Sequence, residues 1–383
     1  MVLLEAVEPR FRAPSSELAR EVLIHGPILR SDLGHRLGLS PATLTRLTRP
    51  LIDRGLLMEM PEQLDGAMGR PAKPLDVRAD ARQFIGIKLT GDEAVAVTTD
   101  LKANEGRRAE RPLPNHDVAV VVDVIAELVH ELANEQEFCA IGITVGGAVS
   151  DQRVVDRSAY LGWQSVHLAD EVEQRLGIPV TVENDLVALT IAEHWFGLAR
   201  GLSKFAVITI GAGVGYSLVM SDKVVSGSDR GFGRGIHFPL DPTGPLCFLG
   251  HRGCSTAMLT IPSIRAQVEV GIGASVSYPD VLRLARQGNP VALTVLQVSG
   301  RALGHFIAAV ANLAMVETVV LAGEGMSMLP VVEDEMWAAI HADRDPEADE
   351  IDLRLDDEGF PSWARGAAAA AIQQTLDTLA TTP

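Results

Sequence analysis

The stretch GPILRSDLGHRLGLSPATLTRLTRPLIDRGLL, residues 26–57, decides the fold of the N-terminal part of the chain. Leucines recur at helical spacing in both halves of this stretch, which predicts two short helices. Gly38 and Leu39 form the expected turn, and Ser40 followed by Pro41 is typical of a helix start. Gly55 is expected to end the second helix, because glycine tolerates the left-handed conformation found there. The pattern predicts a helix-turn-helix.

The second helix of this pair carries polar side chains opposite a buried stripe formed by Leu44, Leu47 and Leu51. Hydroxyls and arginines are suited to the base edges of a DNA major groove. The residues expected to contact DNA are Ser40, Thr43, Thr45, Arg46 and Arg49. Pro50 lies inside this helix, so the helix is expected either to end near Arg49 or to be kinked there.

Two short strands, 56–60 and 75–77, are expected to follow and to form a wing. The loop between them contains Gly69-Arg70-Pro71. Such a tip places an arginine well for a narrow minor groove, where the negative potential is strongest. The alternative for Arg70 is an ordinary solvated loop. Next to a helix-turn-helix, the DNA contact is favoured.

Composition and charge limit the function classes. The chain has 383 residues, 47% hydrophobic and 22% charged, which is typical of a globular protein of two or three domains. No apolar run reaches the roughly 18 residues of a membrane span, and the N-terminus lacks the basic start of a signal peptide. Three cysteines are too few for a disulfide framework. These features predict a cytoplasmic protein with no membrane contact.

The net charge of −17 is distributed unevenly: residues 1–78 carry a net +1 and the remainder −18. Because DNA phosphates repel an acidic surface, DNA contact is expected only from the N-terminal part. In the remainder, strands are expected at 84–89, 94–100, 140–145, 180–182, 205–210, 214–220 and 316–322, and helices at 118–133, 169–176, 186–196, 292–312, 330–341 and 363–379. The acidic segment 343–358 is expected to be a solvated loop or insertion. This order predicts two similar α/β lobes.

Six motifs in this order resemble the ROK family (repressor, open reading frame, kinase). They are GRPAKPLDV (69–77), YLGWQSVHLADEVEQRLGIPVTVEND (160–185), TIGAGVG (209–215), GRGIHF (233–238), CFLGHRGC (247–254) and LAGEG (321–325). The resemblance implies an α/β fold: an N-terminal winged helix-turn-helix followed by a two-lobed actin/hexokinase-like body with ribonuclease H-like lobes. The domains implied are 1–80 for DNA binding, 81–185 with helix 363–383 for the first lobe, and 186–362 for the second lobe.

The chain departs from the kinases of this family at the first phosphate loop. Those enzymes have Asp-x-Gly-Gly-Thr, whereas the matching stretch here is Lys88-Leu89-Thr90-Gly91-Asp92. Phosphoryl transfer depends on positioning and electrostatics at the phosphates. We therefore expect no enzyme activity and no ATP binding, and we expect the remaining loop, with Gly211, Gly213 and Gly215, to be structural.

The resemblance also implies a sugar site. Asp185 matches the family's catalytic base, and without ATP it would only accept hydrogen bonds from a sugar. Asn184 is expected to do likewise, and the alternative is that it caps the following helix. Further ligand contacts are implied at the positions of Tyr160, Arg234, His237 and Thr256. Arg234 stands where the family has a glutamate. An arginine there is suited to an anionic carbohydrate. The alternative, equally favoured, is that Arg234 faces solvent and the pocket is unused.

The family's zinc site is implied only in part. His237, Cys247 and Cys254 match its ligands, but Leu249 occupies the position of the fourth and cannot bind metal. Structural zinc sites are normally four-coordinate. The set therefore favours reduced thiols over a bound zinc ion.

The leading hypothesis is a sugar-responsive transcriptional repressor that binds a palindromic operator as a homodimer or higher homo-oligomer. Ligand binding in the cleft would change the angle between the lobes and the spacing of the two DNA readers. The first alternative is an active sugar kinase with an accessory DNA-binding domain. The second alternative is a DNA-binding protein with an unused cleft. It is kept open by three differences from the family, which has Asn at the position of Tyr160 and Glu at the positions of Arg234 and Thr256.

Overall fold

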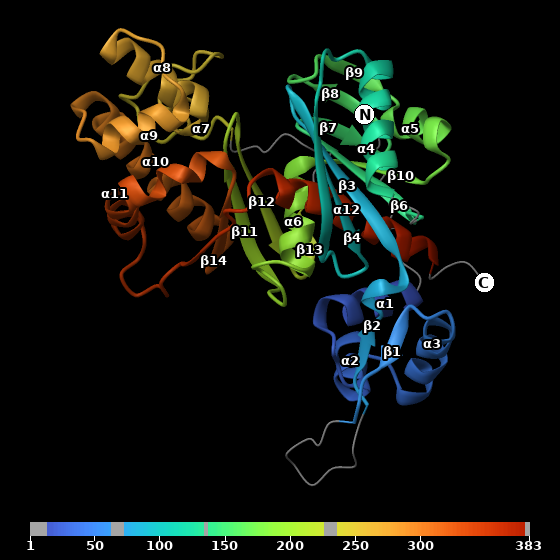
Figure 1. Ribbon diagram of the computed structural model, residues 1–383. Helices are drawn as coiled ribbons and strands as arrows, with labels where there is room; N and C mark the ends of the chain where they lie inside the picture. The colour runs from blue at the N-terminus through green and yellow to red at the C-terminus, as the bar shows by residue number, and fades with distance from the viewer. Residues whose placement is uncertain (1–13, 63–72, 134–136, 226–235, 380–383) are drawn as a thin grey trace, which may run out of the picture.

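The computed structural model describes residues 14–62, 73–133, 137–225 and 236–379. Figure 1 shows a small N-terminal domain, in blue, below a larger body. The body has two lobes, each built around its own five-stranded sheet. The predicted fold class is confirmed by this arrangement.

The N-terminal domain is a winged helix-turn-helix over the residues described. Its elements are α1 (Pro14–His25), α2 (Arg30–Leu37), α3 (Pro41–Asp53), β1 (Leu57–Glu59) and β2 (Leu75–Val77). β1 and β2 pair antiparallel to form the base of the wing. The predicted wing tip, including Arg70, lies outside the described residues.

Local chemistry sets the ends of the reading helix α3. Gly38, with φ of 63°, ends α2 in the left-handed region that glycine adopts without strain. The Ser40 hydroxyl then accepts the N–H of Thr43 at 3.3 Å, and Pro41 begins α3. Gly55, with φ of 70°, follows α3 and turns the chain towards β1. These helix signals are confirmed.

Pro50 does not end the reading helix. α3 continues through it to Asp53, so an end near Arg49 is excluded. Leu51, 2% exposed, packs into the core of the domain and holds the last turn in place. The buried face also differs slightly from the prediction, because Thr48 is buried while Leu47 is only half-buried.

The first lobe has a mixed sheet in the order β10-β6-β3-β4-β5. Its strands are β3 (Gln83–Leu89), β4 (Glu93–Asp100), β5 (Glu105–Pro112), β6 (Ala140–Val145) and β10 (Val180–Asn184). The first three are antiparallel neighbours, whereas β6 runs parallel to both β3 and β10. The carboxyl ends of β3, β6 and β10 therefore meet at one edge of the sheet.

Two helices and a small sheet complete the first lobe. α4 (Val118–Ala133) and α5 (Leu168–Leu176) bury their apolar faces with the large sheet in one hydrophobic cluster. The small sheet contains β7 (Ala148–Ser150), β8 (Val154–Ser158) and β9 (Trp163–Val166), and η1 (Ala79–Ala81) precedes the lobe. The sequence analysis predicted neither the small sheet nor β5.

The second lobe repeats the theme in the order β13-β12-β11-β14-β15. Its strands are β11 (Lys204–Ile210), β12 (Val214–Met220), β13 (Lys223–Val224), β14 (Thr318–Ala322) and β15 (Asp352–Leu355). The solvated loop expected at 343–358 is therefore wrong in part. β15 pairs parallel with β14, and Ile351, which is 3% exposed, packs into the lobe core and holds this acidic segment on the sheet.

Helices cover the outer side of the second lobe. They are α7 (Ser255–Leu259), α8 (Ile261–Ile272), α9 (Tyr278–Arg286), α10 (Pro290–Ala314) and α11 (Leu329–Asp343), with η2 (Glu324–Met328) before α11. Among the described residues, α10 alone has the length and composition to cross a membrane. In its most apolar 18-residue stretch, however, 56% is buried inside the protein. Leu296, Leu303 and Phe306 of α10 form part of the lobe core, as expected of a core helix.

Two helices lie between the lobes and against each other, α6 (Asp185–Trp195) and α12 (Phe360–Leu379). α12 follows the second lobe in sequence but packs on the sheet of the first. This close approach needs glycine: a Cβ on Gly86 would lie 1.9 Å from the carbonyl oxygen of Ala364, and one on Gly142 would lie 1.8 Å from that of Ala367. α6 follows the first lobe in sequence and packs against β12 of the second.

Candidate functional site

The face of α3 that points away from the core carries the predicted DNA-contacting residues. Thr45, Arg46 and Arg49 are exposed, and Thr43 is half-buried. Arg49 pairs with Asp53 one turn later at 3.1 Å, an exposed ion pair of little strength. Arg46 is exposed one turn before Arg49, and its planar guanidinium has the geometry for a bidentate contact with a base.

The hydroxyl groups near the start of α3 have partners within the helix. Ser40 caps the first turn, its oxygen lies 3.0 Å from that of Thr43, and the Thr45 hydroxyl donates to the carbonyl of Pro41 at 2.9 Å. A hydroxyl that donates one hydrogen bond still has acceptor lone pairs. The contacts of these residues with DNA stay a prediction.

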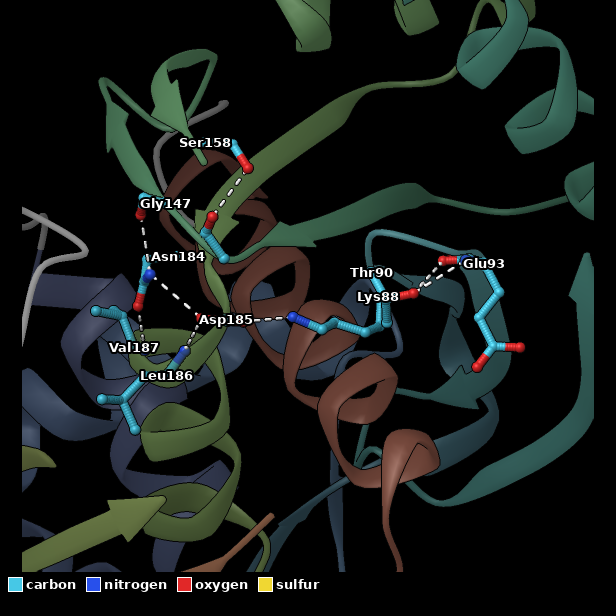
Figure 2. Close-up of polar contacts among 10 residues, drawn as sticks. Lys88, Thr90, Glu93, Gly147, Ser158, Asn184, Asp185, Leu186 and Val187 are labelled. Carbon is cyan, nitrogen blue, oxygen red and sulfur yellow. Dashed lines mark hydrogen bonds and ion pairs between the residues drawn. The ribbon is translucent and has the colours of Figure 1, made fainter. Parts of the chain in front are cut away.

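We use the name interlobe site for the group formed by Lys88, Asp185, Tyr160 and Glu324. Its centre is an ion pair that was not predicted from the sequence. The Lys88 ammonium, near the end of β3, donates to the carboxylate of Asp185 at the start of α6 (Figure 2). The Lys88 side chain is only 7% exposed, and its nitrogen lies 5.3 Å from the ring centroid of Trp363 on α12. A buried ammonium needs such partners, because its desolvation is costly.

This pair changes what Asp185 can do. The carboxylate also accepts the N–H of Leu186 at 2.9 Å. A general base must be free to take a proton from the reacting hydroxyl, whereas Asp185 is held by a fixed cation. Lys88 and Asp185 together still offer donors and acceptors to a polyhydroxyl ligand.

Asn184 forms the N-cap of α6, which is the alternative stated for it. Its side-chain oxygen accepts the N–H of Val187 at 3.1 Å, and its amide donates to the carbonyl of Gly147 at 2.9 Å and to Asp185 at 3.2 Å. The residue is 4% exposed. Its role is to fix Asp185 in place (Figure 2), and a direct ligand contact stays a prediction.

Tyr160 lies between Gly146 of the first lobe and Gly213 of the second lobe. A Cβ on Gly146 of the first lobe would lie 3.0 Å from the tyrosine ring, and one on Gly213 of the second lobe would lie 3.0 Å from its hydroxyl. Burial, and the charges of Asp185 and Glu324, raise the pKa of Tyr160. The structure thus brings Tyr160, Asp185 and Lys88 together, and it adds Glu324, which the sequence analysis did not single out.

The altered first phosphate loop is a closed turn. The backbone N–H groups of Asp92 and Glu93 both donate to the Thr90 hydroxyl oxygen, at 3.1 and 3.0 Å. That hydroxyl lies 3.0 Å from the carbonyl oxygen of Glu93, and Figure 2 shows the contacts between Thr90 and Glu93. In a phosphate-binding loop, such N–H groups point at the ligand instead. In the second loop, Gly211 lies against the carboxylate of Glu324, which would repel a phosphate.

A second cluster contains four metal-binding side chains. His237, Cys247, His251 and Cys254 each offer one ligand atom, and these atoms lie within 4.8 Å of one another. Nδ1 of His237 lies 3.5 Å from the sulfur of Cys254 and 3.7 Å from that of Cys247. Burial and the nearby His251 lower the pKa of His237, which favours the neutral, metal-binding imidazole.

His251 thus supplies the fourth donor that the sequence analysis assigned to Leu249 and judged absent. Leu249 is 61% exposed and has no ligand atom. His251 stands three residues before Cys254, and this spacing was the available signal. Two thiols and two imidazoles are a set that suits tetrahedral zinc.

The remaining predicted ligand residues are not brought to the interlobe site by any described contact. The Thr256 hydroxyl donates to the carbonyl of Ile236, and His237 belongs to the four-residue cluster. Arg234 lies outside the described residues. Their roles in ligand binding stay predictions.

The chain is similar to known proteins of one family. The model of the ROK family matches residues 84–374. The chain is 26% identical over 340 residues to the DNA-binding transcriptional dual regulator NagC of Escherichia coli K12, with 83% of each chain covered. It is 22% identical to the xylose repressor of Bacillus subtilis strain 168, covering 84% of this chain and 85% of that protein.

Solved structures agree. The chain is similar to a structure described as a ROK family transcriptional regulator and homologue of the E. coli MLC protein, at 28% identity and a TM-score of 0.78, covering 96% of this chain and 98% of that one. A ROK family glucokinase from Streptomyces griseus, solved with glucose and AMPPNP, shares the fold at 24% identity and a TM-score of 0.64, covering 75% of this chain and 98% of its own. With the family model matching most of its length, the chain belongs to the ROK family.

Proposed function

We propose that this chain is a DNA-binding transcriptional regulator that responds to a sugar or sugar derivative, and that it acts as a repressor. The observation that carries the proposal is the Lys88–Asp185 ion pair, in a chain whose N-terminal domain is a winged helix-turn-helix over the described residues. The pair removes the free base that a sugar kinase needs, while the N-terminal domain keeps an exposed reading face. Relatives named as repressors support the same conclusion.

Loss of kinase activity follows from two features of the site. Lys88 replaces the first acid of the phosphate loop, and the turn at Thr90 uses the N–H groups of Asp92 and Glu93 internally. Phosphoryl transfer depends on those phosphate contacts. The competing proposal, an active kinase, predicts ADP release when the full chain is given ATP, Mg²⁺ and a hexose such as glucose or N-acetylglucosamine. We expect none above the level of a heat-inactivated sample.

The proposed DNA target is a palindromic duplex bound by a homodimer, and the proposed effector is a carbohydrate in the interlobe site. If the effector is anionic, Arg234 is the residue proposed to bind it. The test is selection of binding sequences from a random duplex pool by the full chain. Arg46→Ala should weaken binding to the selected duplex by roughly tenfold or more and binding to scrambled duplex much less. Arg286→Ala, at an exposed position on α9 far from the N-terminal domain, is the matched control.

We further propose that the cluster of His237, Cys247, His251 and Cys254 holds a structural zinc ion. The donor set and the lowered pKa of His237 support this proposal. Zinc would stabilise the loop that leads into α7, and it would not take part in DNA reading. Elemental analysis of the purified chain tests this directly.

A further inference from the structure

Helix α6 connects the interlobe site with the N-terminal domain. Its first residue is Asp185, the partner of Lys88, and its last is Trp195. Eleven residues span about 16 Å at the rise of an α-helix. At its far end α6 packs against α1, where Trp195 shares a hydrophobic cluster with Leu18 of that helix.

Arg200, in the turn after α6, holds the end of α1. Its Nε donates to the carbonyl of Ile24 at 2.7 Å, and its terminal nitrogen donates to the carbonyl of Gly26 at 2.9 Å. These carbonyls lie at the C-terminal end of α1, where the helix has unpaired acceptors and a negative dipole end. Gly26 is also the first residue of the helix-turn-helix stretch. Arg200 therefore binds the segment that joins α1 to the helix-turn-helix.

The turn that carries Arg200 is fixed to α6. The Glu193 carboxylate accepts the N–H of Leu198 at 2.7 Å, the Glu193 carbonyl accepts the N–H of Ala199 at 3.1 Å, and the N–H of Arg200 donates to the carbonyl of Gly197 at 3.1 Å. Because these hydrogen bonds join the turn to α6, we expect a movement of α6 to displace the Arg200 guanidinium by a similar distance.

The N-terminal domain has a second attachment, which belongs to the first lobe. Lys102, in the turn between β4 and β5, pairs with Asp76 of β2 at 2.7 Å, and the N–H of Leu101 donates to the carbonyl of Ala79 at 2.9 Å. The two attachments meet at Gly26, because a Cβ built there would lie 2.6 Å from the carboxylate of Asp76. α6 packs on β12 of the second lobe, whereas α12, which packs on the first-lobe sheet, also contacts α1. Movement of α6 relative to α12 and to the Lys102–Asp76 pair therefore acts on the N-terminal domain near Gly26.

We propose that Arg200 is a positioning residue that couples the state of the Lys88–Asp185 pair to the orientation of the N-terminal domain. A ligand that separates Lys88 from Asp185 moves the start of α6, and Arg200 carries that displacement to the carbonyls of Ile24 and Gly26. The Lys102 contact with Asp76 serves as the fixed point. This coupling rests on the proposed function of the interlobe site.

The test is a double-mutant cycle that needs no identified effector. Lys88→Met with Asp185→Asn replaces the ion pair by neutral groups of similar size and leaves no buried charge unpaired. This variant is made in the wild-type chain, with Arg200→Ala, and with the control Arg175→Ala, whose partner Asp123 lies on the first lobe away from the N-terminal domain. Each protein is measured by hydrogen–deuterium exchange without DNA, and by affinity for a duplex selected by the wild-type chain.

We expect the neutral pair to change exchange at residues 22–26 and to change duplex affinity roughly fivefold or more, the usual scale of allosteric coupling. With Arg200→Ala, both effects should fall to within twofold, whereas Arg175→Ala should leave them unchanged. Effects of the neutral pair that persist in Arg200→Ala, or a neutral pair without effect at residues 22–26, would overturn the coupling. If the exchange effects appear but no duplex is selected, the coupling stands and the proposed regulatory function fails.

Discussion

Glu193 on α6 gives a prediction of how stability changes with pH. The residue is 3% exposed, and burial is the main cause that raises its pKa to about 7, with the charges of Asp356 and Glu358 adding to it. The Leu198 N–H and the nearby Arg365 act in the opposite direction. From the ordinary value of 4.5, the shift corresponds to about 3 kcal/mol of folding free energy, at about 1.4 kcal/mol per pKa unit.

The sign follows from the protonation states. Below pH 4.5 the Glu193 carboxyl is protonated in both the folded and the unfolded chain, so its burial carries no charge penalty. As the pH rises towards 7 the unfolded chain ionises first, and stability is lost until the folded pKa is passed. Glu193→Gln cannot ionise and keeps an oxygen for the Leu198 N–H. We therefore expect the variant to gain on the wild-type chain as the pH rises, by up to about 3 kcal/mol at pH 8.

Urea unfolding at pH 5 and pH 8, followed by tryptophan fluorescence, measures this difference, because Trp195 lies two residues along the same helix. The matched control is Glu333→Gln, at an exposed position on α11, whose difference from the wild-type chain should be the same at both pH values. A Glu193→Gln variant with an equal difference at both pH values, or one less stable than the wild-type chain at pH 8, would refute the reasoning.

Three further perturbations test other parts of the structure. Lys88→Met leaves the Asp185 carboxylate without its cation and should lower the free energy of unfolding, measured in urea, by about 3–5 kcal/mol. Adding Asp185→Asn should recover most of this loss. Equal stability of the single and double variants would contradict a buried pair. His251→Ala should lower the zinc content measured by elemental analysis from about one ion per chain and lower the melting temperature, and an unchanged content would remove His251 from the donor set. Gly142→Ala should lower the melting temperature by several degrees, because its Cβ would lie 1.8 Å from a carbonyl of α12; an unchanged value would show that the contact relaxes freely.

The helix-turn-helix and most strands of the body were predictable because their signals are local. Ser40, Pro41 and Gly55 mark helix ends by their own backbone chemistry. β3 and β4 are short runs rich in apolar residues, a length and composition typical of buried strands. Such features depend on neighbours in sequence, so a single chain is enough to read them.

The missed strands lack that local signal. β5 carries the run Gly106-Arg107-Arg108 and lies at the edge of its sheet, where polar side chains are tolerated and protect the edge. β15 is held by pairing with β14 and by Ile351, both of which are tertiary contacts. Charge alone therefore predicted a loop where the sheet adds its last strand.

Two residues of the interlobe site were predicted from the sequence, but the ion pair at its centre was not. Tyr160 and Asp185 were singled out from motif positions, and the structure places both beside Gly146. The Lys88–Asp185 pair joins residues 97 positions apart. A charged residue inside the otherwise apolar strand β3 signalled that some buried partner must exist, but only the arrangement of β3, β6 and β10 identifies it.

We propose that the chain reads DNA and that the interlobe site serves as its sensor. The most direct measurement is selection of binding sequences from a random duplex pool by the full chain, in parallel with an assay for ATP-dependent phosphorylation of glucose and N-acetylglucosamine. We expect enrichment of one palindromic sequence, loss of that enrichment with Arg46→Ala, and no phosphorylated sugar. Phosphorylated sugar without any enriched sequence would contradict it.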